Sequence, residues 1–240
     1  MELLRGLDLR ELVTRFGPQP EGRVIHILTQ VCDALAEAHA LSLIHRDIKP
    51  ANVYLCERGG VPDCVKVLDF GLVRLYRNER GSQKHLTGEK GIVSTPWFMS
   101  PESIKDSALS DPRSDIYAVG ALAYFLLTGE YVFNAETVLE IYEQQLTQSP
   151  VPPSRRTANS ISAEVERTIL RCLEKDAQLR PQTIGELRAL LLASPRTADW
   201  GQEQRTAWWN CYQPEAPAVS AQPAPMPATI SIEIAPRADP

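Results

Sequence analysis

The stretch from His45 to Val53, HRDIKPANV, constrains this chain more than any other part of it. Asp47 can accept a hydroxyl proton, Lys49 can neutralise phosphate oxygens, and the amide oxygen of Asn52 can ligate a hard cation such as Mg²⁺. Pro50 keeps the residue before it out of the helical region, so the stretch is expected to be a loop. These side chains, taken together, are suited to phosphoryl transfer.

A second motif begins seventeen positions after Asn52, where Asp69, Phe70 and Gly71 follow the run 65–68 (VKVL). That run predicts a strand. A carboxylate fixed at a strand end, followed by a glycine that can turn sharply, suits a second cation ligand. The alternative for both motifs is a turn in which the Asp and Asn side chains only cap the neighbouring backbone.

The two motifs at this spacing resemble those of the protein kinase family, specifically the eukaryotic-like Ser/Thr kinases common in bacteria. Lys49, two positions after Asp47, is the Ser/Thr form of the loop. The resemblance covers about residues 1–194. It implies a protein-kinase-like α+β fold, represented here mainly by the α-helical C-terminal lobe with a short β-hairpin.

The resemblance also implies the reaction, which is transfer of the γ-phosphoryl group of ATP to a Ser or Thr hydroxyl of a protein substrate. Asp47 would orient the hydroxyl and accept its proton, and Lys49 would neutralise the phosphoryl group in flight. Asn52 and Asp69 would hold Mg²⁺, so the implied cofactors are ATP and Mg²⁺. The protein would contribute positioning and electrostatics rather than covalent chemistry.

Residues 1–6 look like the hinge that joins the two lobes of such a kinase. Backbone groups at Glu2 and Leu4 are then expected to meet the adenine edge, and Asp8 the ribose hydroxyls. Tyr54 and Leu68 are expected in the floor of the adenine pocket, with plain core packing as the alternative for Tyr54.

The motifs that the family places before the hinge, a Gly-rich loop, a strand Lys and a helix Glu, do not occur in these 240 residues. Met1 falls at the gatekeeper position, or it is the first residue of a shortened reading frame. Because the adenine floor would be exposed, the chain by itself is expected to be catalytically silent. It is also expected to self-associate or to depend on a partner that covers this surface.

Residues 69–102 show little periodicity and match the activation segment of the family, which closes here with Ser100-Pro101-Glu102. Within it, Ser94–Met99 resembles the substrate-docking loop, and this includes Trp97. Thr95 falls where a hydroxyl bridges the catalytic Asp and Lys. Arg46 is expected to attract a phosphate, with Thr87 as the first candidate for the activating site and Ser82 and Ser94 after it. The alternative is that Thr87 is an ordinary exposed loop residue.

Residues 116–128 are apolar nearly all round, which predicts a buried core helix that is too short to cross a membrane. The resemblance implies structural roles for five residues: His45, Phe70, Glu102, Asp115 and Arg180. Asp115 would anchor the backbone of the catalytic loop near His45, and Glu102 would form an ion pair with Arg180.

Other elements are expected from periodicity and capping signals. The expected helices lie at 6–16, from Pro20 to the catalytic loop, and at 137–146, 162–173 and 183–192. Strands are expected at 53–55 and 64–68, with a polar turn at 57–63 between them.

The kinase pattern stops at Ser194. The expected organisation is a hinge at 1–6, the lobe at 7–194, a Trp-rich C-terminal extension at 195–212, and a Pro/Ala-rich disordered tail at 213–240. The extension carries Trp200, Trp208 and Trp209, and it is expected to pack back on the body. Its aromatic side chains are otherwise a surface for docking a partner.

Composition limits the class of protein. A net charge of −5 gives no support to nucleic-acid binding, and no apolar run is long enough to span a membrane. The five cysteines have no metal-like spacing, which indicates free thiols and, with no signal-peptide pattern, a cytoplasmic location. The alternative function is a non-catalytic kinase lobe that docks partner proteins, and a regulatory protein partner is compatible with either reading.

Overall fold

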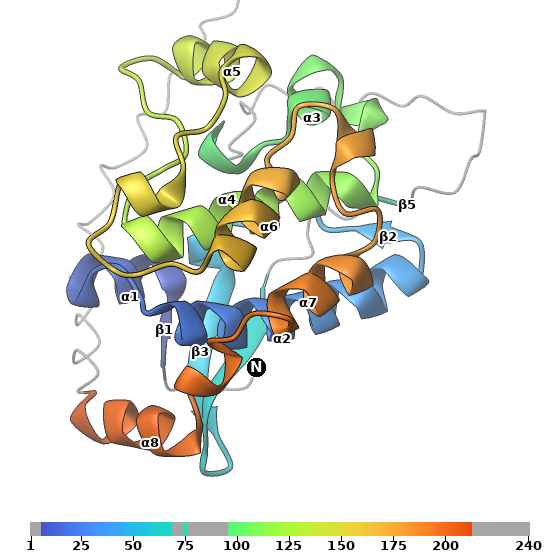
Figure 1. Ribbon diagram of the computed structural model, residues 1–240. Helices are drawn as coiled ribbons and strands as arrows, with labels where there is room; N and C mark the ends of the chain where they lie inside the picture. Colours follow the sequence, from blue (N-terminus) through green and yellow to red (C-terminus); the bar gives the residue numbers. More distant parts are fainter. Residues whose placement is uncertain (1–5, 69–73, 76–95, 213–240) are drawn as a thin grey trace, which may run out of the picture.

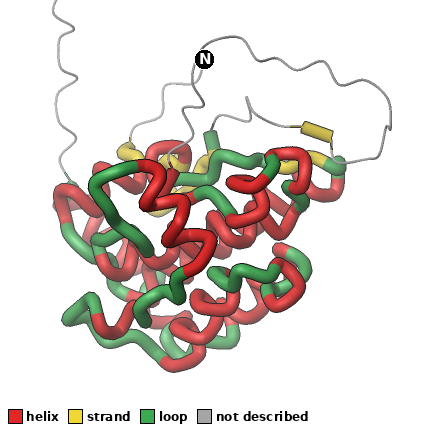
Figure 2. Tube along the Cα trace, turned by 90° about the horizontal axis from the view of Figure 1, so that it is seen from above, coloured by secondary structure: helices red, strands yellow, loops and turns green. Residues whose placement is uncertain are grey.

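The computed structural model describes residues 6–68, 74–75 and 96–212. Helices make up most of this body, and the short strands gather along one edge of it (Figure 2). The α+β architecture that the sequence predicts, a helical lobe with a small β-hairpin, is confirmed. None of the helices in the described ranges is both long and apolar enough to cross a membrane.

The longer elements follow one another through the lobe (Figure 1). The helices are α1 (Leu9–Phe16), α2 (Glu21–Ala40), α3 (Pro101–Lys105), α4 (Pro112–Thr128), α5 (Val138–Thr147), α6 (Ala163–Cys172), α7 (Ile184–Leu192) and α8 (Gln202–Cys211). Short 3-10 turns include η1 (Pro50–Asn52), η3 (Pro96–Phe98) and η7 (Thr197–Asp199).

The main sheet has three antiparallel strands in the order β1-β3-β4, formed by β1 (Gly6–Asp8), β3 (Val53–Arg58) and β4 (Val61–Val67). A separate pair joins β2 (Leu43–Ile44) to β5 (Arg74–Leu75). Gly59 and Gly60, with φ of 57° and 78°, make the tight turn between β3 and β4. Glycine adopts this left-handed backbone without steric cost.

Helix α4 is the centre of the core, because every residue from Ser114 to Thr128 is buried. The predicted core helix is therefore confirmed, but it begins at Pro112 rather than at residue 116. The cause is a cap, since the Asp111 side chain accepts from the backbone N–H of Arg113 and proline fits the first helical position.

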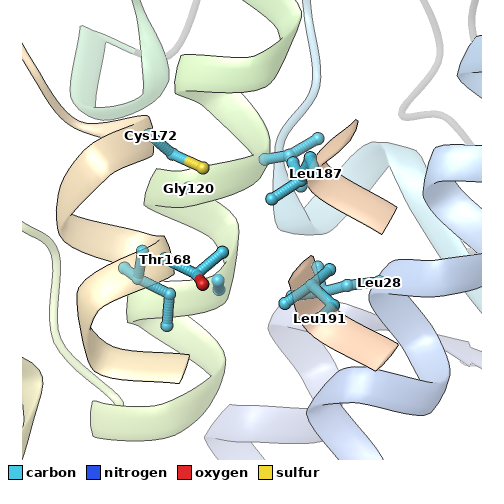
Figure 3. Close-up of a pocket in the computed structure, with 9 residues that line it drawn as sticks. Leu28, Gly120, Thr168, Cys172, Leu187 and Leu191 are labelled. Atoms are coloured by element: carbon cyan, nitrogen blue, oxygen red, sulfur yellow. The ribbon is translucent and has the colours of Figure 1, made fainter. Parts of the chain in front are cut away.

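Side chains from α2, α4, α6 and α7 meet in one apolar junction of the core (Figure 3). Gly120 of α4 faces Cys172 of α6 there, and a Cβ built on Gly120 would lie 2.5 Å from the Cβ of Cys172. Two helices can approach so closely only where one of them lacks a side chain. This contact sets the spacing between α4 and α6.

Two sequence predictions of local structure are wrong. Residues 6–16 are not one helix, because residues 6–8 pair with β3 and the helix begins only after Asp8 caps it. Residues 57–63 are not one polar turn either, because the strands continue to Arg58 and resume at Val61. Asp63 consequently lies on a strand and is buried, with 1% exposure.

The C-terminal extension folds back on the lobe, as predicted. Helix α8 lies beside the β3–β4 hairpin, far from α5 (Figure 1). Trp209 and Tyr212 are buried and belong to the same hydrophobic cluster as the residues of α2 and α4. This segment is therefore part of the folded body.

Candidate active site

The backbone of the loop that carries Asp47 is anchored by one buried carboxylate. Asp115, fully buried near the start of α4, accepts hydrogen bonds from the backbone N–H groups of His45 at 3.0 Å and Arg46 at 2.9 Å. The ring of His39, at the end of α2, lies 2.8 Å from the same carboxylate. Two helices thus fix the backbone from which Asp47 projects.

His45 is buried and joins the catalytic loop to the end of the sheet. Its Nδ1 accepts from the backbone N–H of Asp47 at 3.3 Å, so its Nε2 carries the proton towards the carbonyl oxygen of Leu68, 3.1 Å away. Arg46 has a φ of 66°, a left-handed conformation that non-glycine residues adopt at a cost of about 1–2 kcal/mol. The anchored neighbours hold this backbone in place.

Asp47, Lys49 and Asn52 converge on one point. The Lys49 ammonium lies 2.7 Å from Oδ2 of Asp47, and Nδ2 of Asn52 donates to the same oxygen at 2.8 Å. Nδ2 of Asn52 also donates to the backbone carbonyl of Asp47 at 2.8 Å. The Asp47 and Lys49 side chains remain 14% and 17% exposed, so a substrate can reach them.

This geometry has a clear chemical use. The carboxylate is oriented by two donors and faces solvent, which suits it to accept a proton from an incoming hydroxyl. The Asn52 amide oxygen has the hardness that Mg²⁺ prefers, and Asn52 is held rigidly in a buried position. Among the described residues there is no group of three or more His, Cys, Asp or Glu side chains that could hold a metal by themselves. The donor set fits a cation shared with phosphate oxygens.

Asp8, Tyr54 and Leu68 lie at one end of the sheet, where β1 and β4 finish and β3 begins. Asp8 of β1 is directly opposite Tyr54 of β3, and the Leu68 backbone N–H donates to the Asn52 carbonyl at 2.8 Å. The Asp8 carboxylate caps α1 by accepting from the backbone N–H of Glu11 at 2.8 Å. Burial raises the pKa of the Tyr54 phenol, with smaller contributions from nearby charges.

The segment after the catalytic loop is anchored around Trp97. Its indole stacks on Tyr131, with 4.8 Å between ring centroids, and Tyr131 stacks on Phe125 of α4 at 5.4 Å. The Gln145 side chain, buried on α5, donates to the carbonyl oxygen of Pro96. Sequence reasoning missed the partners Tyr131 and Gln145, because neither belongs to a motif.

The structure contains the ion pair between Glu102 and Arg180. Nη1 and Nη2 of Arg180 each donate to the carboxylate at 2.8 Å, and the Ser114 hydroxyl adds a third hydrogen bond at 2.7 Å. Burial alone would raise the pKa of Glu102, but the hydrogen bonds and charge of Arg180 outweigh it and lower the pKa to about 2. The pair fixes the end of the segment that carries Trp97.

Several residues that the sequence singled out lie outside the described residues, and these are Met1, Glu2, Leu4, Asp69, Phe70, Ser82, Thr87, Ser94 and Thr95. Those within the described part of the chain fall into four groups. Asp47, Lys49 and Asn52 meet at one point, and Asp8, Tyr54 and Leu68 lie at one end of the sheet. Arg46, His45 and Asp115 form the support of the loop, while Trp97, Glu102 and Arg180 hold the segment that begins at residue 96. His39, which also supports Asp115, carries no sequence signal that could have found it.

The protein kinase domain model matches residues 1–189. The chain is 41% identical over 194 residues to the serine/threonine-protein kinase pkn3 of Myxococcus xanthus, which covers 80% of this chain and 35% of that protein. It is 34% identical over 192 residues to the serine/threonine-protein kinase PknB of Mycobacterium tuberculosis strain H37Rv, covering 80% and 29%. The chain thus spans about a third of the length of these relatives.

A solved structure is similar in fold. The crystal structure of the Rad53 kinase domain and SCD2 in complex with AMPPNP superposes with a TM-score of 0.63 and 25% sequence identity. The match covers 81% of this chain and 69% of that one.

Proposed function

The chain belongs to the protein kinase family, and we propose that it forms the large lobe of a kinase that phosphorylates serine and threonine residues of proteins. The observation that carries the proposal is the convergence of Lys49 and Asn52 on one oxygen of Asp47, at 2.7 and 2.8 Å. The loop that holds them is anchored by Asp115, so the arrangement is fixed before any substrate arrives.

The proposed mechanism assigns one task to each side chain. The substrate hydroxyl binds against Asp47, which orients it and takes its proton on the carboxylate as the oxygen attacks. Lys49 lies beside that carboxylate and neutralises charge on the transferred group. The rigid anchor of the loop keeps these groups in place through the reaction.

We assign ATP as the phosphoryl donor, with Mg²⁺ held by Asn52 and Asp69. The oxygen chemistry of Asn52 supports the metal assignment, and the AMPPNP in the similar Rad53 structure supports the nucleotide. When bound, the cation neutralises phosphate charge. The adenine and ribose would meet the hinge at Glu2 and Leu4 together with Asp8, and the pocket floor at Tyr54 and Leu68.

Substrate docking and activation are assigned to the segment around Trp97. The aromatic stack of Trp97 on Tyr131 supports a rigid docking surface, and Thr95 would bridge Asp47 and Lys49. Thr87 is the proposed activating phosphosite, with Arg46 as the group that receives the phosphate. Phe70 would pack beside the metal-binding Asp69.

The proposed organisation keeps the boundaries of the sequence analysis, with a hinge at 1–6, a lobe at 7–194, an extension at 195–212 and a tail at 213–240. We assign the protein to the cytoplasm. The support for this location is that all five cysteines are free thiols, as in proteins of a reducing compartment.

The test is a phosphorylation assay of the chain joined to an amino-terminal lobe of the family. Asp47→Ala is expected to lower the turnover of a Ser/Thr peptide by roughly 10²-fold or more, the scale of a lost general base. The matched control is Asp33→Ala on the exposed face of α2, where Asp33 forms a salt bridge with Arg188 at 2.7 Å. Turnover of Asp47→Ala equal to that of the control would refute the assignment and favour a binding module.

The activation proposal is tested separately in the same protein. Phosphate mapped to Thr87 in the active form, with activity lost in Thr87→Ala, is the expected result. Full activity of Thr87→Ala with phosphate on another residue would show that a different site activates the enzyme.

A further inference from the structure

The segment 195–212 lies beyond the residues that the family model matches, yet it is bound tightly to the lobe. It contributes η7 and α8, which lie against α2 and the β3–β4 hairpin (Figure 1). Three of the four tryptophans of the chain are in it. Its contacts centre on one carboxylate and end at the first strand of the sheet.

Asp63 is the centre of these contacts. Its carboxylate is fully buried and accepts from Arg23 at 2.9 and 3.2 Å, while the indole N–H groups of Trp200 and Trp209 each donate to it at 2.6 Å. The Gln30 side chain donates to the backbone carbonyl of Asp63 at 2.9 Å. Two of the donors that satisfy this buried charge therefore come from the extension.

Arg23 is enclosed by the same segment. Its guanidinium carbon lies 3.8 Å from the ring centroid of Trp208 and 4.9 Å from that of Trp200, while its side chain is 1% exposed. A cation over aromatic faces is stabilised most when water is excluded. The extension thus completes a buried ion pair that belongs to the lobe.

Tyr212 brings the end of this segment to β1. Its ring stacks on Trp208 with 5.3 Å between centroids, and its hydroxyl donates to the carbonyl oxygen of Gly6 at 3.2 Å. Tyr212 is 8% exposed, so the contact is shielded from solvent.

Gly6 is tightly enclosed at this point. A Cβ built on Gly6 would lie 2.1 Å from the carbonyl oxygen of Leu55 in β3, so no larger residue fits the observed backbone. On β1, two positions further, Asp8 faces Tyr54. The strand that carries the expected ribose ligand is therefore held by β3 along one edge and by the Tyr212 hydroxyl at its first residue.

We propose that residues 195–212 form a latch on the nucleotide edge of the lobe, and that Tyr212 is a positioning residue that acts through Gly6 on Asp8. The effect of Tyr212 on nucleotide binding rests on the proposed kinase function, whereas the contact between Tyr212 and Gly6 does not. Tyr212 touches neither substrate nor nucleotide. It fixes the backbone from which the ribose ligand projects.

Hydrogen exchange of the 240-residue chain tests the latch without any activity. Tyr212→Phe removes only the hydroxyl, and a net hydrogen bond corresponds to about a fivefold change in local opening. The amides of Gly6–Asp8 are expected to exchange about fivefold faster, while those of α4 are unchanged. The control is Tyr142→Phe on α5, at the far side of the lobe, which is expected to leave Gly6–Asp8 unaffected. Equal exchange in the two variants would overturn the proposal.

A second measurement tests the positioning role in the chain joined to an amino-terminal lobe. Tyr212→Phe is expected to raise the KM for ATP about two- to fivefold and to leave kcat within about twofold, because only nucleotide binding is affected. An unchanged KM together with faster exchange would overturn the role in positioning. A wild-type protein without kinase activity would refute the proposed function and leave the exchange result to decide the latch.

Discussion

Within the described residues, two arginine–carboxylate pairs have a buried guanidinium, and they are satisfied in different ways. Arg180 donates to Glu102 and to the backbone carbonyls of Arg113, Glu174 and Lys175, all within the part that the family model matches. The other pair, Arg23 with Asp63, relies on tryptophans that follow Asp63 by 137 and 146 residues.

The two pairs differ in the part of the chain that supplies their hydrogen-bond partners. All the hydrogen-bond partners of the Arg180 pair named above lie within the matched domain. The Glu102 carboxylate of this pair is 18% exposed. The Arg23 pair has exposures of 1% and 0%, and it would be open to water on the side that η7 and α8 cover. A buried charge without its donors is costly, so the second pair makes the lobe depend on its own extension.

The largest expected effect comes from neutralising each carboxylate in turn. Asp63→Asn should lower the free energy of unfolding by about 3–5 kcal/mol, because Arg23 and two indole donors lose a buried anion. Asparagine tolerates the left-handed φ of 56° at this position, so backbone strain does not contribute. Urea unfolding measures the change.

The matched variant is Glu102→Gln, which should cost about 2–3 kcal/mol because Arg180 keeps its carbonyl acceptors and the site is partly exposed. An equal or larger loss in Glu102→Gln would contradict the comparison.

Acid should remove the folding stability that the ionised Glu102 carboxylate provides. Its pKa is about 2 in the folded protein against 4.5 ordinarily, so the unfolded chain takes up the proton first as the pH falls. The stability that Glu102 provides is complete above about pH 4.5 and is lost towards pH 2. The gap between wild type and Glu102→Gln should close by about 2 kcal/mol over this window. A gap that stays constant in acid unfolding curves would show that the pair is not ionised as described.

Single indole donors should matter less. Trp200→Phe keeps most of the aromatic ring and removes one hydrogen bond to Asp63, which should cost about 1–2 kcal/mol. Trp97→Phe is the control, because the Trp97 indole nitrogen is buried with no hydrogen-bond partner in the described part of the chain. It should cost less than about 1 kcal/mol. Equal losses in thermal unfolding would mean that the indole donors add nothing.

The smallest expected effect is the pH response of His26. Burial and then the charge of Arg205, whose Nη1 lies 3.1 Å from the ring, lower the pKa of His26, while Asp63 opposes the shift. The folded protein therefore resists protonation, and stability falls as the pH drops below about 6.5.

His26→Gln should flatten this decline between about pH 7 and 5.5, by less than about 1 kcal/mol. An identical slope in wild type and variant, measured by urea unfolding at each pH, would exclude His26 as its source.

Sequence reasoning succeeded where a motif fixes both partners. Asp115 and Arg180 could be assigned because they stand at set positions relative to the catalytic loop and to Glu102. The central helix could be predicted because it is apolar on every side. These features depend on local pattern or on spacing within one family.

The Asp63 site could not be predicted for physical reasons. Arg23 and Asp63 are 40 residues apart, and a charged residue three positions after two glycines is typical of an exposed turn. Strand β1 could not be predicted either. It has only three residues and lies directly before a helix, so it shows no alternating pattern of apolar and polar residues. The tryptophans of the extension predicted packing, but nothing in their pattern named the carboxylate that they bind.

The claim that the extension is part of the lobe is tested most directly by urea unfolding of Trp97→Phe with two probes. In this variant all remaining tryptophans, Trp200, Trp208 and Trp209, lie in the extension, so fluorescence excited selectively at tryptophan reports on that segment alone. Far-ultraviolet circular dichroism reports on the helices of the whole lobe.

A single cooperative unit gives coincident transitions, and the two midpoints are predicted to agree within about 0.2 M urea. A fluorescence transition complete at clearly lower urea, with the helical signal intact, would show that the extension detaches from a lobe that is stable without it.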